Sequence, residues 1–107
     1  MPATASLTKL PAGHPKKYRV TVVTHDGKKR KKRTVNFGQQ GASDYTRHKD
    51  VTRKKRYLTR HGGGRENWTA SGIFTAGFWS RWLLWSKPSL AAAKSEISRR
   101  FAVKFVR

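Results

Sequence analysis

A cluster of aromatic residues in the C-terminal half constrains the fold of this chain more than any other feature. Between Trp68 and Trp85 lie nine large apolar residues, and all four tryptophans of the chain are among them. Phe78, Trp79 and Trp82 follow at helical spacing, which is typical of a helix that buries one side in a core. Because 107 residues suit one core, we expect a single small domain built around this segment.

The same cluster allows other interpretations. A chain of this length scarcely covers four tryptophans and five phenylalanines by itself. Some of the rings could therefore pack against a partner protein, stack on bases, or contact a membrane surface. The residues selected for packing against a partner are Trp68, Phe78, Trp79, Trp82 and Trp85.

Positive charge is the second dominant feature. Lysine and arginine total 25 against five acidic residues, which gives a net charge of +20. Residues 1–67 carry 18 of the basic residues, and residues 68–107 carry seven. A compact body with this charge repels itself, so the composition predicts a polyanionic partner such as a nucleic acid, an anionic membrane or an acidic protein surface.

The local pattern predicts an α+β fold. Prolines and a glycine predict an irregular arm over residues 1–15, ahead of a domain over 16–107. Alternating apolar residues on both sides of Asp26-Gly27 predict a β-hairpin over residues 16–37, with Tyr18 opposite Val35. A basic helix is expected over 44–61 and an aromatic-rich helical part over 68–107, in which Ser89 caps a helix to about Arg100 and a short strand follows.

Two cationic segments are the candidate contacts for a polyanion. Six consecutive cations begin at Lys28, on the returning strand of the hairpin, where alternate side chains point to opposite faces. A second group rings the predicted basic helix, which the triplet Gly62-Gly63-Gly64 ends as a flexible joint. The candidate residues are Lys28, Lys29, Arg30, Lys31, Lys32, Arg33, Arg47, Arg53, Lys54, Lys55, Arg56 and Arg60.

Catalysis and cofactor binding have little support. His48 lies four residues after Asp44 and could form an acid–base pair with it, but a helix cap beside local charge pairs explains the same residues. His61 and Glu66 could add metal ligands, although the spacing is wrong for a zinc motif and the surrounding charge repels cations. Without cysteines or an apolar run of about 20 residues, disulfides, thiolate metal sites, a signal peptide and a membrane span are not expected. We therefore expect a non-enzymatic protein with no cofactor, metal or small-molecule substrate.

Several short motifs together resemble a known family. In order they are Val35-Asn36-Phe37-Gly38, Asp44-Tyr45-Thr46, His48-Lys49-Asp50, Arg53-Lys54, Tyr57, Arg60-His61, Glu66-Asn67-Trp68, Gly72-Ile73 and the run from Thr75 to Trp85. Over about residues 30 to 105 this order resembles small basic proteins of nucleocytoplasmic large DNA viruses. The resemblance implies a viral origin, with no established enzyme activity and no functional residues to transfer.

These observations predict a structural protein of a virus particle. As a minor capsid or internal component, it would lie inside or under the capsid shell, within the infected host cell, and contact other virion proteins together with DNA or membrane. The alternative is a non-specific nucleic-acid-binding protein that acts in genome packaging, condensation or transcription. Retention with the shell after DNA removal would separate the first function from the second.

Overall fold

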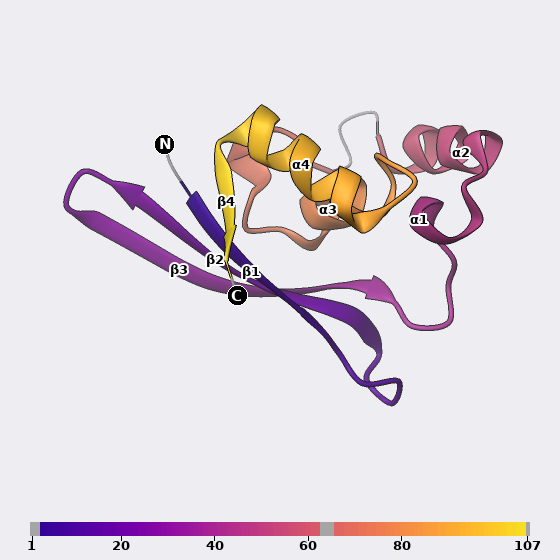
Figure 1. Cartoon of the computed structure of the whole chain (residues 1–107), viewed down its shortest axis with the longest axis horizontal. Coiled ribbons are helices and arrows are strands. Elements are labelled where there is room, and N and C mark those ends of the chain that lie inside the picture. Colours follow the sequence, from indigo (N-terminus) through magenta and orange to yellow (C-terminus); the bar gives the residue numbers. More distant parts are fainter. Residues whose placement is uncertain (1–2, 63–65, 107) are drawn as a thin grey trace.

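The chain folds into two layers, a sheet and a group of short helices that covers one of its faces (Figure 1). The structure is a computed structural model, and it describes residues 3–62 and 66–106. The sheet has four strands in the order β3-β2-β1-β4. This arrangement confirms the predicted α+β class.

Residues 3–9 of the N-terminal segment form a strand, so the predicted irregular arm over residues 1–15 is wrong for this part, whereas residues 10–15 are irregular as predicted. Strand β1 (Ala3–Lys9) lies between β2 (Lys16–Asp26) and β4 (Val103–Val106), antiparallel to the first and parallel to the second. Its signal was an alternation of small apolar and hydroxyl residues, in which Ala3 and Ala5 are buried. Because alanine is only weakly hydrophobic, this alternation gave a weak strand signal. The neighbouring prolines therefore decided the prediction in favour of an irregular segment.

The predicted hairpin forms, but its register differs from the predicted one by two residues. Strand β3 (Lys29–Gln39) pairs with β2 so that Tyr18 lies opposite Phe37 and Val20 opposite Val35. The loop consists of Gly27 and Lys28, with Gly27 at a φ of 60°, rather than of Asp26 and Gly27. A shift by two keeps every side chain on its predicted face and pairs apolar residues with each other.

The predicted basic helix is divided into two. Helix α1 (Tyr45–His48) begins at the capping residue Asp44, and α2 (Val51–His61) begins at Asp50. Between them Lys49 has a φ of 57°, a left-handed conformation that ends a helix. Asp50 has an extended backbone, and its carboxylate accepts hydrogen bonds from the first amides of α2. Of the expected glycine joint, Gly62 caps α2, and residues 63 and 64 lie outside the described part.

The aromatic-rich part forms the helical layer. It comprises the 3₁₀ turn η1 (Ala70–Gly72), helix α3 (Ala76–Trp79), the π-helical turn η2 (Ser80–Leu84) and helix α4 (Leu90–Phe101). Ser89 caps α4 as predicted, because its hydroxyl accepts a hydrogen bond from the amide of Ala92. The short strand predicted after α4 is β4.

The core lies between the sheet and this helical layer. Phe78, Trp79 and Leu83 are completely buried there against Val20 and Phe37 of the hairpin. Gly38, with a φ of 77°, brings the end of β3 close to Leu84, since a Cβ atom on Gly38 would lie 2.9 Å from the Cδ1 atom of that leucine. The aromatic cluster therefore forms the core of a single domain.

Candidate polyanion interface

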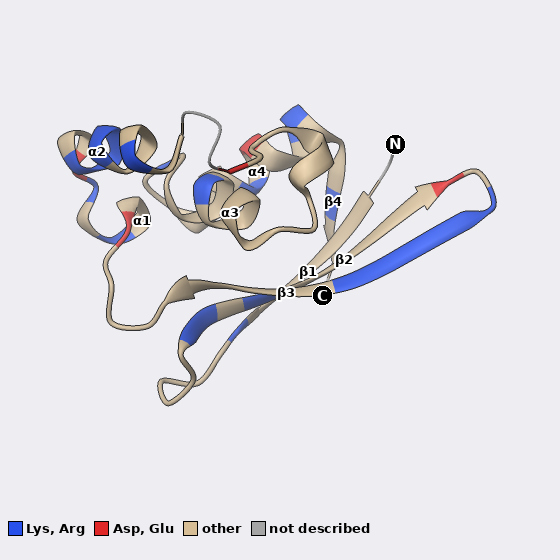
Figure 2. Cartoon of the chain, turned by 180° about the vertical axis from the view of Figure 1, so that it is seen from behind, with Lys and Arg blue, Asp and Glu red and all other residues tan. Residues whose placement is uncertain are grey.

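The hairpin presents its six consecutive cations to solvent. Residues Lys28 to Arg33 are all exposed, and they follow one another along β3 from the turn onward (Figure 2). Among the residues that the structure describes, no carboxylate forms an ion pair with them. In the described part of the chain, the one side-chain contact of this segment is that of Lys31. Its Nζ atom lies 4.7 Å from the centre of the Phe74 ring. The charge of this segment is therefore exposed and not paired with a carboxylate in the described structure.

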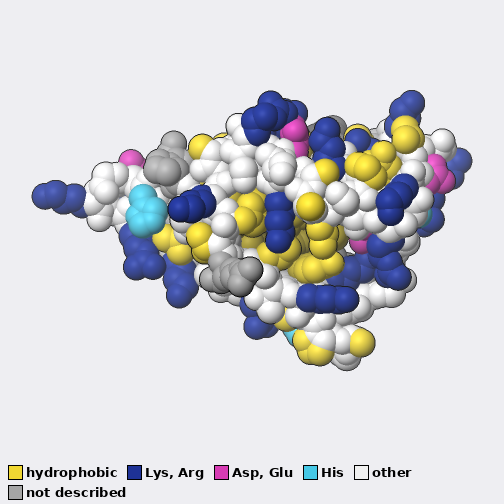
Figure 3. All heavy atoms as spheres, viewed as in Figure 1, with side chains coloured by type: hydrophobic (Ala, Val, Ile, Leu, Met, Phe, Trp, Pro, Cys, Tyr) yellow, Lys and Arg dark blue, Asp and Glu magenta, His cyan; other side chains and the backbone are white. Residues whose placement is uncertain are grey.

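The second cationic group lies at the other end of the molecule. In Figure 3 the lysines and arginines of the hairpin tip and those of α2 occupy opposite ends of the long axis, which measures 43 Å. Arg53, Lys55 and Arg56 of α2 are exposed, as is Arg47 of α1. The two groups predicted from the sequence are therefore separate surfaces.

The cations of α2 border a cleft of about 1320 Å³. The residues that line it include Arg53, Arg56 and Tyr57 of α2, Lys16 of β2 and Leu84 of η2. Lys16 was absent from the residues predicted to bind a polyanion, because its distance of nearly forty residues from α2 in the sequence gives no sign of this proximity.

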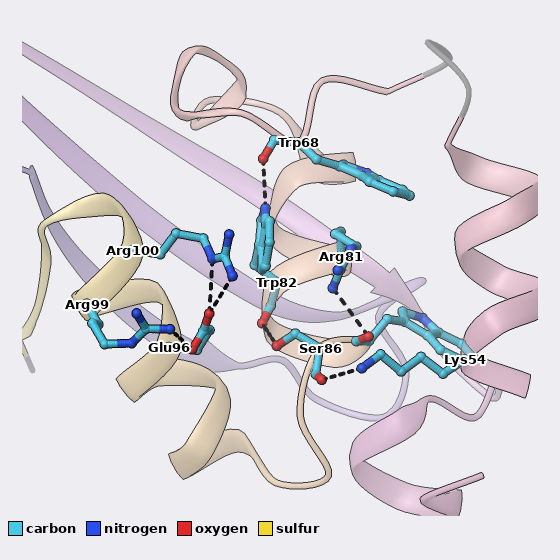
Figure 4. A network of polar contacts seen from close by, with 9 residues as sticks. Lys54, Trp68, Arg81, Trp82, Ser86, Glu96, Arg99 and Arg100 are labelled. Carbon is cyan, nitrogen blue, oxygen red and sulfur yellow. Dashed lines mark hydrogen bonds and ion pairs between the residues drawn. The ribbon is translucent and has the colours of Figure 1, made fainter. Parts of the chain in front are cut away.

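Lys54 is only partly exposed, unlike its neighbours on α2, and its assignment to polyanion binding stays a prediction. Its ammonium group donates a hydrogen bond of 2.8 Å to the carbonyl oxygen of Ser86 (Figure 4). The same group lies 4.9 Å from the centre of the Tyr45 ring. Burial lowers the pKa of Lys54, and the positive charges of Arg81 and Lys87 lower it further. This lysine attaches α2 to the helical layer.

Four of the five carboxylates are used inside the fold. Asp44 is buried, caps α1 and pairs with Lys17 at 2.8 Å. Asp50 caps α2. Glu66 accepts one hydrogen bond from the indole N–H of Trp68 and lies 3.2 Å from the imidazole Nδ1 of His61. The fifth carboxylate, Asp26, lies opposite Lys29 in the strand pairing of the hairpin but forms no ion pair in the described structure, so the hairpin has one acidic residue beside six cations.

Glu96 shows the same use of acid on α4. Its carboxylate accepts hydrogen bonds from Arg99 at 2.6 Å and from Arg100 at 3.0 Å (Figure 4). The hydrogen bond from Arg99 is the largest cause that lowers the pKa of Glu96 to about 2, followed by that from Arg100. Glu96 therefore stays ionised near neutral pH, and its carboxylate remains a charged partner for the two arginines.

A stack of rings joins α2 to the core. The Tyr57 ring is buried and lies parallel to that of Trp85, with 4.4 Å between the ring centres, and 4.3 Å from the ring of His61. Burial raises the pKa of the Tyr57 phenol, with a further contribution from the negative charge of Glu66. Stacking of this kind holds a helix that has few other apolar residues.

The residues predicted to pack against a partner are instead part of this chain's own core. Phe78 and Trp79 are completely buried, and Trp82 is 9% exposed with its indole N–H donating to the carbonyl of Trp68. Trp68 and Trp85 are half-buried and pack against the same core. Arg81 lies over the rings of Trp68 and Trp82, which are 5.4 and 4.2 Å from its guanidinium carbon. The assignment of Phe78, Trp79 and Trp82 to a partner interface is therefore wrong, because no partner can reach buried rings.

The possible catalytic pair is not assembled. The Nδ1 atom of His48 accepts a hydrogen bond of 2.9 Å from the amide of Asp50, and its ring lies against that of Trp85. The carboxylate of Asp44 is directed to Lys17 and to the first turn of α1. In residues 3–62 and 66–106, no group of three or more side chains is placed to hold a metal ion, and no helix has the length and apolar character needed to cross a membrane.

Comparison with known proteins supplies one match. Residues 5–61, just over half of the chain, match the family described as Family of unknown function (DUF5754). The chain belongs to this family. The matched segment contains most of β1 together with β2, β3, α1 and α2, and it thus includes both cationic groups but not the aromatic layer that covers the sheet. No curated protein and no solved structure matches the chain.

Proposed function

We propose that this chain is a non-enzymatic structural component of a virus particle that binds polyanions through its exposed cations. The observation that carries the proposal is the hairpin, whose six consecutive cations are all exposed and lack a carboxylate partner in the described structure. Bringing such a segment to a row of phosphates releases the counter-ions condensed on them. The chain would therefore bind DNA or an anionic membrane by charge, without sequence selectivity.

The setting in a virus rests on the resemblance to basic proteins of large DNA viruses. A minor capsid or internal component would lie under the capsid shell, where packaged DNA, membrane and neighbouring capsid proteins are within reach. Because its aromatic rings are used in its own core, contacts with virion proteins would fall to its cationic surfaces. Acidic patches on the neighbouring proteins would be their complement.

A second candidate function follows from that same burial. A nucleic-acid-binding protein that acts in genome packaging, condensation or transcription needs cationic surfaces but no anchor in a shell. The loss of Phe78, Trp79 and Trp82 as anchors favours this candidate relative to the sequence-based expectation. The two functions differ in whether the protein has a fixed place in the particle.

Fractionation of purified particles tests the choice between them. A structural component is expected at a constant copy number and stays with the shell after the DNA is removed by nuclease. Release together with the DNA would instead support the second candidate. Absence from the particle would exclude the structural function.

Salt titration tests the binding itself. With about five phosphates engaged, the logarithm of the affinity for DNA should fall against the logarithm of salt concentration with a slope of about −5. Replacement of Lys28 to Arg33 by glutamine should reduce that slope strongly. An unchanged slope would exclude the hairpin as the contact surface.

A further inference from the structure

The sheet has one open face, opposite the helical layer. In Figures 1 and 2 all the helices lie on the same side of the sheet. Successive residues of a strand point to opposite faces, and Val20, Val22, Val35 and Phe37 point toward the core. The residues between them therefore point outward, and no described segment of the chain lies over them.

The strand pairing orders these outward residues in rows. One row crosses the sheet from Lys104 through Thr4 and Val23 to Lys32. The next two rows contain mainly hydroxyl and amide side chains, with Arg19 donating a hydrogen bond of 3.0 Å to Asn36. The members of these two rows are Val106, Ser6, Thr21 and Thr34, and then Thr8, Arg19 and Asn36.

The chemistry of this face is that of a phosphate-binding surface. Hydroxyl groups and Arg19 lie on its two inner strands, and further cations lie at its two edges on β3 and β4, while none of the five carboxylates of the chain is at an outward position of the strands. Serine, threonine, asparagine, lysine and arginine are the side chains that contact the phosphates and sugars of nucleic acids. The alternation of β3 adds Arg30 to the same face as Lys32.

We propose that this open face of the sheet is the surface that lies along the phosphate backbone of double-stranded nucleic acid. The inference rests on the proposed polyanion binding, and it specifies both the polyanion and the surface. Lys32 and Lys104 are three strand spacings apart, or about 14 Å. That separation is comparable with the width of a major groove, about 12 Å, so the two edges could reach phosphates of both strands.

The composition of the face distinguishes a duplex from the other polyanions. Binding of single strands on a sheet depends on aromatic rings that stack with the bases. The described outward residues include no phenylalanine, tyrosine or tryptophan, and the one ring among them is the imidazole of His25, which lies opposite Arg30 near the hairpin tip. Binding within a membrane surface requires apolar or aromatic residues that enter it, and Val23 and Val106 are the two large apolar residues on this described face. Contact with the outside of a duplex requires neither.

The two faces of β3 provide a matched test. The double variant Arg30→Gln with Lys32→Gln removes one arginine and one lysine from the open face. Lys31→Gln with Arg33→Gln removes the same two charges from the same strand on the helical side. Because all four side chains are exposed, both variants should fold, which thermal unfolding would verify.

Binding of a 20-base-pair DNA duplex is the measurement, over a range of salt concentrations. The open-face variant should bind the duplex about tenfold more weakly. Its slope of log affinity against log salt concentration should become less steep by nearly two, and both changes should be clearly smaller in the helical-side variant. Equal losses would show that only net charge matters and would overturn the inference while leaving polyanion binding intact. Failure of the unaltered protein to bind any polyanion at low salt would instead overturn the proposed function.

Two further measurements test the identity of the polyanion with the same protein. Lys104→Gln on β4 should weaken duplex binding more than Lys94→Gln on α4, a lysine on the helical side. The unaltered protein should bind the duplex more tightly than single-stranded poly-dT or vesicles containing phosphatidylserine at equal charge concentration. Preference for the single strand or the vesicles would overturn the assignment to a duplex.

Discussion

The two cationic ends of the molecule look alike in the sequence and differ in what the fold does with them. At the hairpin, the cations project from a strand whose apolar residues are confined to its other half, and the contact of Lys31 with the Phe74 ring is the one described contact of these cations with a residue that packs on the core. At α2, Lys54 turns inward to Ser86, and Tyr57 stacks on Trp85. The charged strand of the hairpin is held in the fold by the apolar residues of its other half. Helix α2 is held in place by contacts of Lys54 and Tyr57, which belong to the helix itself.

This difference teaches that a run of basic residues is not one functional unit. In α2 the cluster from Arg53 to Arg56 consists of three exposed cations and one lysine that stabilises the fold. A loss of DNA binding after neutralising α2 could therefore arise from a displaced helix. A loss after neutralising the hairpin would report on contact alone.

The strongest test of the comparison is removal of the ring that holds α2. Tyr57→Ala should lower the free energy of unfolding by about 3–5 kcal/mol, because a buried aromatic side chain and its stacking on Trp85 are lost. Urea denaturation measures the change. Tyr57→Phe keeps the ring and should cost less than about 1.5 kcal/mol. Similar losses in both variants would show that the hydroxyl, and not the stack, holds the helix.

A smaller effect is expected for the lysine that turns inward. Lys54→Met keeps the apolar stem but leaves the carbonyl of Ser86 without its donor, which should cost about 1 kcal/mol in unfolding free energy. Lys55→Met on the same helix is the control and should change stability by less than about 0.5 kcal/mol. Equal changes in the two variants would mean that the contact of Lys54 with Ser86 adds nothing to the stability of the fold. In that case α2, like the hairpin, would not depend on its cations for its position.

Acid provides a test in a third region, α4. Since the folded pKa of Glu96 is about 2, below the usual value of 4.5, its pairing stabilises the fold fully above about pH 4.5 and is lost as the pH falls toward 2. The midpoint of urea unfolding should decrease over that window. Glu96→Gln should remove this part of the decrease. Parallel curves for the variant and the unaltered protein would show that other carboxylates cause the acid sensitivity.

The smallest effect on stability is expected at the hairpin. Replacement of Lys29, Arg30, Lys31 and Lys32 by glutamine should leave the unfolding free energy nearly unchanged, because these side chains are exposed and the ring contact of Lys31 is worth about 0.5 kcal/mol. Reduced repulsion within the segment offsets that loss. Thermal unfolding of the four-fold variant measures the result. A loss above about 2 kcal/mol would contradict the view that this charge is kept for partners.

Local signals in the sequence were sufficient for much of the fold. Asp-Gly between alternating segments predicted the hairpin. Ser43 or Asp44 was expected to cap the basic helix and Ser89 the helix after Pro88, and Asp44 and Ser89 are the caps observed, because their side chains accept hydrogen bonds from amides a few residues away. The alternation near Val103 predicted β4. Each of these features depends on residues that are neighbours in the chain.

The features that were missed depend on distant residues. Strand β1 is held by β2 and β4 rather than by strong strand propensity, and the hairpin register follows from the pairing of Val20 with Val35 in a core that the helical layer completes. The break at Lys49 arises because Asp50 caps a new helix. For the candidate site, exposure of the hairpin followed from its sequence, but the inward turn of Lys54 required knowledge of where Ser86 lies.

The parallel pairing of β1 with β4 has a consequence for how the chain reaches its folded state. Ala3 pairs with Val103, so the sheet joins segments separated by a hundred residues. Contacts between such distant segments form slowly, since a long loop must close before they are gained. Until then one edge of β1 stays unpaired and open to other chains. Mutual repulsion between molecules of charge +20 would limit association during that interval.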